Sequence, residues 1–243
     1  MALSKIGTNS ISDDAITTAK LPNDAVTSAK IADGTIATGN IADDAITAAK
    51  IDDDGTGFTV GDLTIGSTAA KKAGVETIWV PANSMYPNTT NGCALITQVE
   101  LSNGPEIKVL DFDASSDENA QFSVAFPKSW NEGTITFKAY FTVTGTNTGT
   151  VAWGLSGVAI ADDDSINTAF GTNVVATAKA HSGTSNDIDV SAESGAVTIA
   201  GSPAAGEQVF FQIMRDVSAD DQSGDARLLG VQLFFTTDAA NDA

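Results

Sequence analysis

The chain contains 243 residues, and its 12 Lys and Arg residues against 31 Asp and Glu residues give a net charge of −19 at neutral pH. This balance excludes nucleic-acid binding, because a polyanion is bound through clustered Lys and Arg side chains that replace its counterions. It also disfavours binding to anionic membrane surfaces. Hydrophobic residues make up 42% of the chain, which is enough to build at least one packed domain.

Cys93 is the only cysteine, so an intrachain disulfide and any multi-cysteine zinc or iron–sulfur site are excluded. No apolar stretch reaches the length of a signal peptide or a membrane span. We therefore expect a soluble protein, made in the cytoplasm, whose fold is held together by packing.

A ten-residue unit with the pattern I-x-D-D-A-I-T-x-A-K recurs near the start of the chain. Its copies begin at Ile11, Leu21, Ile31 and Ile41, and a truncated copy begins at Ile51. Large aliphatic residues consequently recur every five positions, at Ile6, Ile11, Ile16, Leu21, Val26, Ile31, Ile36, Ile41, Ile46 and Ile51.

Residues five positions apart do not share one face of a helix, and they do not share one face of a strand either. We therefore expect no long regular element, but a single helical turn in each repeat, capped by Asp or Asn and followed by an extended residue. Leu21 supports this break, because a residue before proline is pushed out of the helical region. An interwound β-type shaft is the alternative.

A strip one side chain wide has no opposing layer against which to bury its aliphatic residues. Copies of the strip wrapped around a common axis would provide that layer, so the repeat predicts self-association, most simply as a homotrimer, through the ten aliphatic residues named above. The alternatives are a disordered leader, which the Asp-, Thr- and Ala-rich composition suggests, and a coiled coil, which a five-residue period disfavours.

The rest of the chain is predicted to be all-β. We divide it into a repeat shaft at 1–55, a glycine-punctuated neck at 56–73 and a jelly-roll-like β-sandwich at 74–243, because short alternating segments are separated by Gly, Asn, Asp and Ser. Net charge is −5 over 1–55 and −14 over the remainder. Strands are expected near 75–80, 94–100, 106–112, 121–126, 134–144, 150–160, 172–180, 187–191, 196–200, 207–215 and 227–236.

Catalytic and metal-binding motifs are scarce. His181 is the single histidine and precedes Ser182 in a serine-rich turn, so we expect it in an exposed loop. No G-x-S-x-G elbow is present, so a Ser–His–Asp triad is disfavoured and no enzyme activity is expected. The acidic runs lack EF-hand spacing, and we expect them to be solvated turns without metal or cofactor. These runs are 52–54, 162–164 and 216–225.

Two further clusters are compatible with carbohydrate chemistry. Asp111, Asp113, Asp117 and Glu118 are dense enough for a glycosidase pair, but sequence does not fix the separation that such a pair needs. Aromatic rings either stack on sugars or fill a core. Tyr140 is the best surface candidate, because it lies on the face of its predicted strand opposite to the apolar residues. The other aromatic candidates are Trp79, Trp130, Trp153 and Tyr86.

The repeats resemble the short repeats at the amino ends of tailed-bacteriophage fibre and appendage proteins. The segments 111–142, 151–160 (V-A-W-G-L-S-G-V-A-I) and 225–235 (D-A-R-L-L-G-V-Q-L-F-F) are similar to virion proteins of marine phages. Together with the repeats, these segments are spread over the length of the chain. The resemblance brings no catalytic residue onto this sequence.

What the resemblance implies is a trimeric structural protein of the virion, with an N-terminal shaft and a C-terminal β-sandwich head. As a tail fibre or short appendage, it would contact other virion proteins and attach to a glycan or protein receptor on the host surface. The alternative is a capsid decoration, cement or head-fibre protein at threefold positions of the shell. A free carbohydrate-binding module or depolymerase is the third possibility.

Overall fold

The computed structural model describes residues 11–12, 15–23, 25–42, 45 and 74–238. The chain divides into two compact units, Met1–Thr64 and Ile65–Ala243, and each unit is described by itself. The predicted neck at 56–73 lies outside the described residues, as do Ile6, Ile46 and Ile51 of the repeat series.

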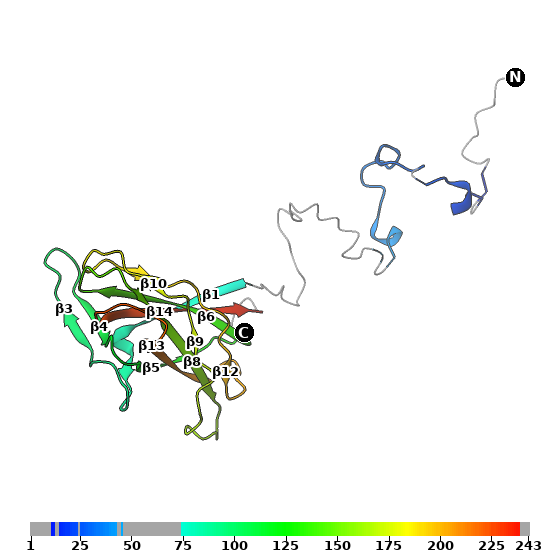
Figure 1. Cartoon of the computed structure of the whole chain (residues 1–243). Helices are drawn as coiled ribbons and strands as arrows, with labels where there is room; N and C mark the ends of the chain where they lie inside the picture. The colour runs from blue at the N-terminus through cyan, green and yellow to red at the C-terminus, as the bar shows by residue number, and fades with distance from the viewer. Residues whose placement is uncertain (1–10, 13–14, 24, 43–44, 46–73, 239–243) are drawn as a thin grey trace. The chain divides into compact units, whose positions relative to one another are not determined.

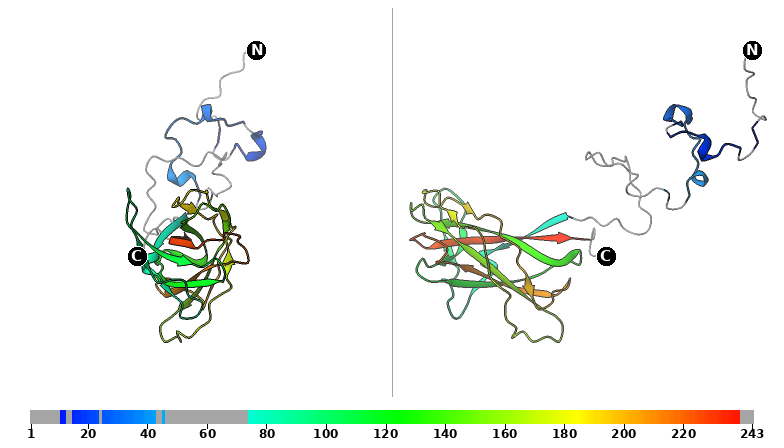
Figure 2. Two further views of the ribbon diagram at one scale, coloured as in Figure 1. Left: turned by 60° about the vertical axis from the view of Figure 1, so that its left-hand side comes forward. Right: turned by 45° about the vertical axis from the view of Figure 1, so that its right-hand side comes forward.

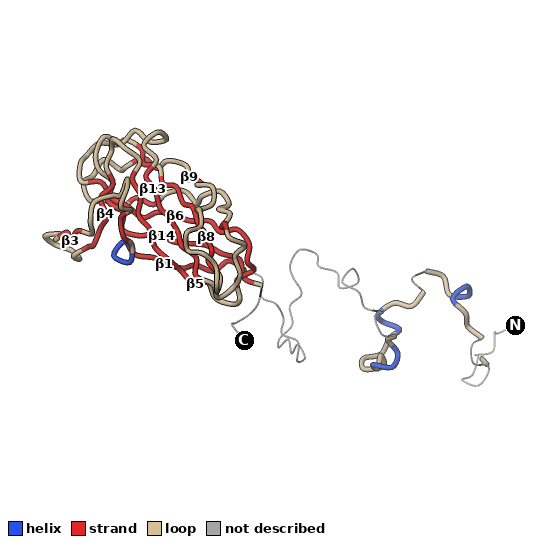
Figure 3. Tube along the Cα trace, turned by 90° about the horizontal axis from the view of Figure 1, so that it is seen from below, coloured by secondary structure: helices blue, strands red, loops and turns tan. Residues whose placement is uncertain are grey.

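The described repeats form a series of tight turns (Figure 3). Single 3₁₀ turns close three successive repeats at η1 (Thr18–Lys20), η2 (Ser28–Lys30) and η3 (Thr38–Asn40). A second turn, such as the one in which the Ala25 N–H donates to the Pro22 carbonyl at 3.1 Å, precedes each of them. The prediction of one short helical turn is confirmed for the three repeats at 11–40, whereas the second turn was not predicted. The Asp residues expected as caps at 13–14, 24 and 43–44 lie outside the described residues, and no strand occurs in the described part of 11–45.

The five-residue spacing of the aliphatic side chains follows from these turns. Two turns per decapeptide return the chain to an equivalent position every five residues, so each turn is accompanied by one large aliphatic residue. Lysine side chains close the unit: Nζ of Lys20 donates to the Ala15 carbonyl at 2.6 Å, and Nζ of Lys30 donates to the Ala25 carbonyl at 2.7 Å. Each of these hydrogen bonds joins two residues of the same decapeptide.

The second unit is a β-sandwich of two six-stranded sheets (Figure 1). In the first sheet, the long β14 pairs along one side with β6 and along the other with β4 and then β1 (Figure 2). Its strands are β1 (Gly74–Pro81), β3 (Thr97–Val99), β4 (Ile107–Phe112), β6 (Trp130–Val143), β11 (Asp189–Val190) and β14 (Ala226–Thr237).

The second sheet has β13 at its centre, paired with β5 and β8. Its strands are β2 (Tyr86–Pro87), β5 (Glu118–Ala125), β8 (Trp153–Ile160), β9 (Val174–Val175), β12 (Ile199–Ala200) and β13 (Gln208–Arg215); β7 (Thr150–Val151) pairs separately with β10 (Lys179–Ala180). Within 74–238 the one helical element is η5 (Ala82–Ser84).

The core lies between the sheets and is built by alternation along each strand. The predicted inward face of β6, which runs from Ile135 to Val143 at every second residue, is buried, while Tyr140 on the opposite face is partly exposed. On β13, Val209, Phe211 and Ile213 close the core from the other side. This arrangement confirms the predicted all-β sandwich.

Most of the long strands were predicted at their observed positions. From β4 to β8 the long strands alternate between the two sheets, which is the connectivity of jelly rolls. The prediction was wrong at several segments: 172–180 forms two separate two-residue strands, 150–160 is divided into β7 and β8, which pair in different sheets, and β2 was not expected. The strands predicted at 94–100, 187–191 and 196–200 are shorter than expected. Tyr86–Pro87 is too short to show alternation, and it exists only through its pairing with β5.

Candidate ligand-binding site

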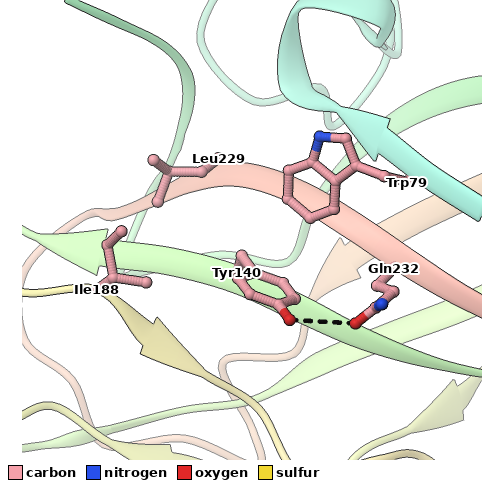
Figure 4. Close-up of a pocket in the computed structure, with 5 residues that line it drawn as sticks. All are labelled: Trp79, Tyr140, Ile188, Leu229 and Gln232. Carbon is pink, nitrogen blue, oxygen red and sulfur yellow. Dashed lines mark hydrogen bonds between the residues drawn. The ribbon is translucent and has the colours of Figure 1, made fainter. Parts of the chain in front are cut away.

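An apolar pocket of about 430 Å³ opens on the outer face of the first sheet (Figure 4). It lies over β1, β6 and β14, next to β11. Five residues line it: Trp79, Tyr140, Ile188, Leu229 and Gln232.

Strand register brings these side chains together. Trp79 on β1 is directly opposite Gln232 on β14, and Tyr140 on β6 is opposite Gly230. A β-bulge between Leu228 and Gly230 shifts the alternation of β14, so that the buried positions change from 226 and 228 before the bulge to 231 and 233 after it. Leu229, at the bulge, lines the pocket.

Gly230 is what allows the Trp79 ring to lie against the sheet. A Cβ atom at this position would come within 2.5 Å of two carbon atoms of the Trp79 ring and within 2.7 Å of the Val80 carbonyl oxygen. Any other residue would therefore push the ring away from β14. Glycine at the bulge thus fixes one wall of the pocket.

The pocket combines aromatic surface with a small number of polar groups. The side chain of Trp79 is 49% exposed, and its ring packs edge-on against Tyr140 with centroids 5.1 Å apart. The Tyr140 hydroxyl donates to Oε1 of Gln232 at 3.1 Å, which leaves the amide N–H groups of Gln232 available. A ligand ring with an apolar face can stack on the aromatic surface of such a site, while the Gln232 amide donates to a hydroxyl of the ligand.

The structure separates the five aromatic residues considered from the sequence. Trp79 and Tyr140 meet in this pocket, whereas Tyr86 is exposed on the second sheet. Trp130 and Trp153 are fully buried, Trp130 stacked on Phe126 and Trp153 edge-on to Phe112. As sugar-platform candidates Trp130 and Trp153 were wrong, because both belong to the core.

Ile188, Leu229 and Gln232 were not considered as site residues from the sequence. Gln232 alternates with the apolar residues Val231 and Leu233, and that pattern places it on the outer face of its strand. The positions of Ile188 and Leu229 depend on strand pairing and on the bulge. No local signal in the sequence indicates either.

His181 belongs to a buried polar network. Its Nδ1 lies 2.6 Å from Oδ2 of Asp189, and its Nε2 lies 3.3 Å from the Gly145 carbonyl oxygen. The neighbouring Ser182 hydroxyl donates instead to Asp187 at 2.8 Å. The expectation of an exposed loop histidine is corrected, since His181 is 3% exposed. No imidazole nitrogen is left to activate Ser182.

The acidic residues of the 216–225 loop are held in structural hydrogen bonds. Asp220 pairs with Arg215, Asp221 accepts from the backbone N–H and hydroxyl of Thr150, and Asp216 accepts from Ser218. Among the residues that the structure describes, no three His, Cys, Asp or Glu side chains gather as metal ligands. The run 52–54 lies outside those residues.

In the 162–164 turn, the Asp164 carboxylate accepts from the Ala161 N–H at 3.3 Å, so one of its three acidic side chains closes the turn itself.

The Asp111–Glu118 cluster is also engaged locally. Asp111 accepts from Arg227 at 3.0 Å, and Glu118 accepts from the Asp113 N–H at 2.7 Å. Burial raises the pKa of Asp111, although Arg227 opposes the change, and burial likewise raises the pKa of Glu118. Asp117 accepts from the Val217 N–H. None of the four acids lines the Trp79 pocket.

Comparisons with known proteins give structural likeness only. No family model matches the chain, and no curated protein sequence matches it. Among solved structures, the C-terminal CBM6 of LamC, a marine laminarinase from Zobellia galactanivorans, is 14% identical with a TM-score of 0.35, over 65% of this chain and 98% of that one. CBM35 from Cellvibrio japonicus Abf62 is 8% identical with a TM-score of 0.37, over 68% and 100%.

At these TM-scores the likeness supports no statement about the ligand of this chain, and the sandwich assignment rests on its own strand pairing. Within the described ranges, no helix has the length and apolar character needed to cross a membrane.

Proposed function

We propose that this chain is a structural component of a bacteriophage virion, a homotrimeric tail fibre or short appendage that assembles through its decapeptide repeats and attaches to the host surface through its β-sandwich. The proposal rests on one observation. The aliphatic side chains of the described repeats, Ile11, Ile16, Leu21, Val26, Ile31, Ile36 and Ile41, are 42–56% exposed in the single chain.

Within a single chain, these aliphatic side chains have no apolar layer to pack against. The turns already pair backbone groups within each decapeptide, as in the bond from the Lys20 N–H to the Thr17 carbonyl at 2.9 Å. Apolar surface gains about 25 cal/mol per Å² when it leaves water, and a regular row of such surface matches the same row on another copy. Three copies around one axis would enclose every layer.

The test is the native mass of the full chain, measured by mass photometry or light scattering. We expect three times the chain mass of 24.8 kDa. Ile16→Asp combined with Ile36→Asp places unpaired charges in the enclosed layers and is expected to shift the mass toward monomer while the sandwich stays folded.

The matched control is Ser12→Asp combined with Ala32→Asp, which adds the same charge at the variable second position of the repeat and should leave the trimer intact. A native chain that stays monomeric at micromolar concentration would refute the assembly. Immunogold labelling of intact particles distinguishes the fibre from the alternative of capsid decoration, because the two differ in position on the virion.

A second candidate function is carbohydrate binding by the β-sandwich, and the Trp79–Tyr140 pocket favours it. The exposed Trp79 ring can stack on the C–H face of a sugar, and the free amide of Gln232 can donate to its hydroxyls. Affinity electrophoresis in host polysaccharide should show retardation that Trp79→Ala reduces and that Trp79→Phe partly restores. Equal mobility of all three proteins would exclude this role for the pocket.

A further inference from the structure

The outer face of the second sheet carries a row of uncharged polar side chains. Tyr86 on β2 is opposite Gln121 on β5, Gln121 is opposite Gln212 on β13, and Gln212 is opposite Ser156 on β8. Gln212 alternates with core residues of its strand, so this row points away from the core. It lies on the sheet that does not contain the Trp79 pocket.

The side-chain amides of this row are hydrogen-bonded to one another and still have donors and acceptors available for further hydrogen bonds. Oε1 of Gln212 accepts from Nδ2 of Asn88 at 2.8 Å and from Nε2 of Gln121 at 3.3 Å. The two N–H groups of Gln212 and the Oε1 atom of Gln121 therefore remain available. Oδ1 of Asn88 is buried and has no hydrogen-bond partner, and a buried acceptor in this state is stabilised by any donor that reaches it.

Two hollows meet at Tyr86 and Gln121, which line both of them. One, of about 320 Å³, has apolar walls that include Phe170 and Phe210. The other, of about 280 Å³, continues past Asn88 along 87–90. None of the residues that line either hollow is charged, although the chain as a whole has a net charge of −19.

We infer that this groove, which we call the amide groove, binds a neutral oligosaccharide. Planar amides can donate and accept at once, which suits the paired hydroxyls of a sugar. The exposed ring of Tyr86, at 49% exposure, provides a face for the C–H side of a pyranose. Anionic glycans are excluded as ligands, because the groove has no cationic side chain and the protein is strongly acidic.

This inference does not depend on assembly of the repeats or on the Trp79 pocket. It places a binding site for the same class of ligand on the opposite sheet, built from different residues. A sugar bound there would contact Asn88 and Gln121 through hydrogen bonds and Tyr86 through stacking. Gln212 lines neither hollow, and its role is to hold the amides of Asn88 and Gln121 in place.

The test is calorimetric titration of the full chain with neutral hexasaccharides of glucose, xylose, mannose and galactose, with sulfated and uronic-acid oligosaccharides as charged probes. We expect at least one neutral probe to bind and no charged probe to do so. Gln212→Leu should weaken that binding about tenfold or more, since it removes the oxygen that holds the amides of Asn88 and Gln121 in place while keeping the side-chain volume. Tyr86→Ala, at an exposed edge position, should weaken it similarly.

Gln208→Leu is the matched control, because it makes the same change on the same strand at an exposed position that lines neither hollow, and it should retain full affinity at the amide groove. Binding that is lost in Trp79→Ala but kept in Gln212→Leu and Tyr86→Ala would overturn the inference and support the Trp79 pocket instead. The absence of binding by every neutral probe would also overturn it, and neither outcome bears on trimer formation. Unfolding midpoints of the variants confirm that each sandwich remains folded.

Discussion

Arg215 and Asp220 form a buried bidentate ion pair, in which Nε of Arg215 donates to Oδ2 at 2.8 Å and Nη2 donates to Oδ1 at 3.2 Å. The remaining N–H groups of the guanidinium donate to the carbonyls of Phe112, Gln222 and Gly224. All five donors of the arginine are therefore used. The pair ties the acidic loop after β13 to the end of β4.

Removing the arginine should be costly, because Asp220 would remain buried without its partner. We expect Arg215→Met to lower the free energy of unfolding by about 3–5 kcal/mol, measured by urea denaturation. Arg215→Met combined with Asp220→Leu should recover part of this loss, since no isolated charge is then left inside. A double variant less stable than Arg215→Met would show that the pair is not the source of the stability.

Cys93 is expected to be unreactive in the folded protein. Burial raises the pKa of its thiol to about 12, and the nearby Glu118 carboxylate adds to the shift. Because the thiolate is the reactive form, alkylation by iodoacetamide near pH 8 should be at least about a hundredfold slower in the native protein than in urea. Cys93→Ser measures the alkylation of groups other than this thiol. Equal alkylation rates in the native protein and in urea would contradict the prediction.

The Asp221 carboxylate should contribute a pH-dependent part of the stability. Hydrogen bonds from the backbone N–H and the hydroxyl of Thr150 lower its pKa in the folded state. Its contribution is therefore complete above the ordinary Asp pKa of about 3.9 and is lost as pH falls through the lowered folded-state value. The stability gap between the native protein and Asp221→Asn should narrow from about pH 6 to about pH 3.

Urea unfolding at several pH values measures this gap. Asp162→Asn, in an exposed turn, controls for the loss of one negative charge. A gap that is constant or widens on acidification would contradict the assignment.

Gly230→Ala should displace the Trp79 ring, because the added Cβ atom has no room beside it. Overpacking of this kind costs about 1–3 kcal/mol. Trp130 and Trp153 are fully buried, so quenching of tryptophan fluorescence by acrylamide reports mainly on Trp79 and should increase in the variant. Gly104→Ala, where a Cβ atom would have ordinary contacts, is the control and should leave the quenching unchanged. Unchanged quenching in Gly230→Ala would show that Gly230 does not position the Trp79 ring.

The sequence predicted the sandwich because alternation is a local signal. In 134–144 the apolar residues fall on one face, and the structure buries that face in β6. The repeat turns were predicted for the same reason, since Pro22 restricts the residue directly before it and the turn from Pro22 to Ala25 lies within one repeat.

The candidate sites could be predicted only in part, because their residues come from strands far apart in the chain. Tyr140 was assigned to a surface from its own strand, but nothing near it in the sequence indicates that Trp79 packs against it. Gln212 and Asn88, which are hydrogen-bonded across the second sheet, likewise have no common local pattern. The acidic run 216–225 was expected to be a solvated turn, and no local pattern indicates that its Asp220 carboxylate pairs with the buried Arg215.

The self-contained hydrogen bonding of each decapeptide has a consequence for how such a protein can change over generations. Since the turns described for residues 11–45 donate and accept within their own unit, an in-frame duplication or deletion of thirty nucleotides would add or remove one unit without breaking the bonds of its neighbours. The number of repeats can therefore change in steps of one whole unit while the sandwich is inherited unaltered.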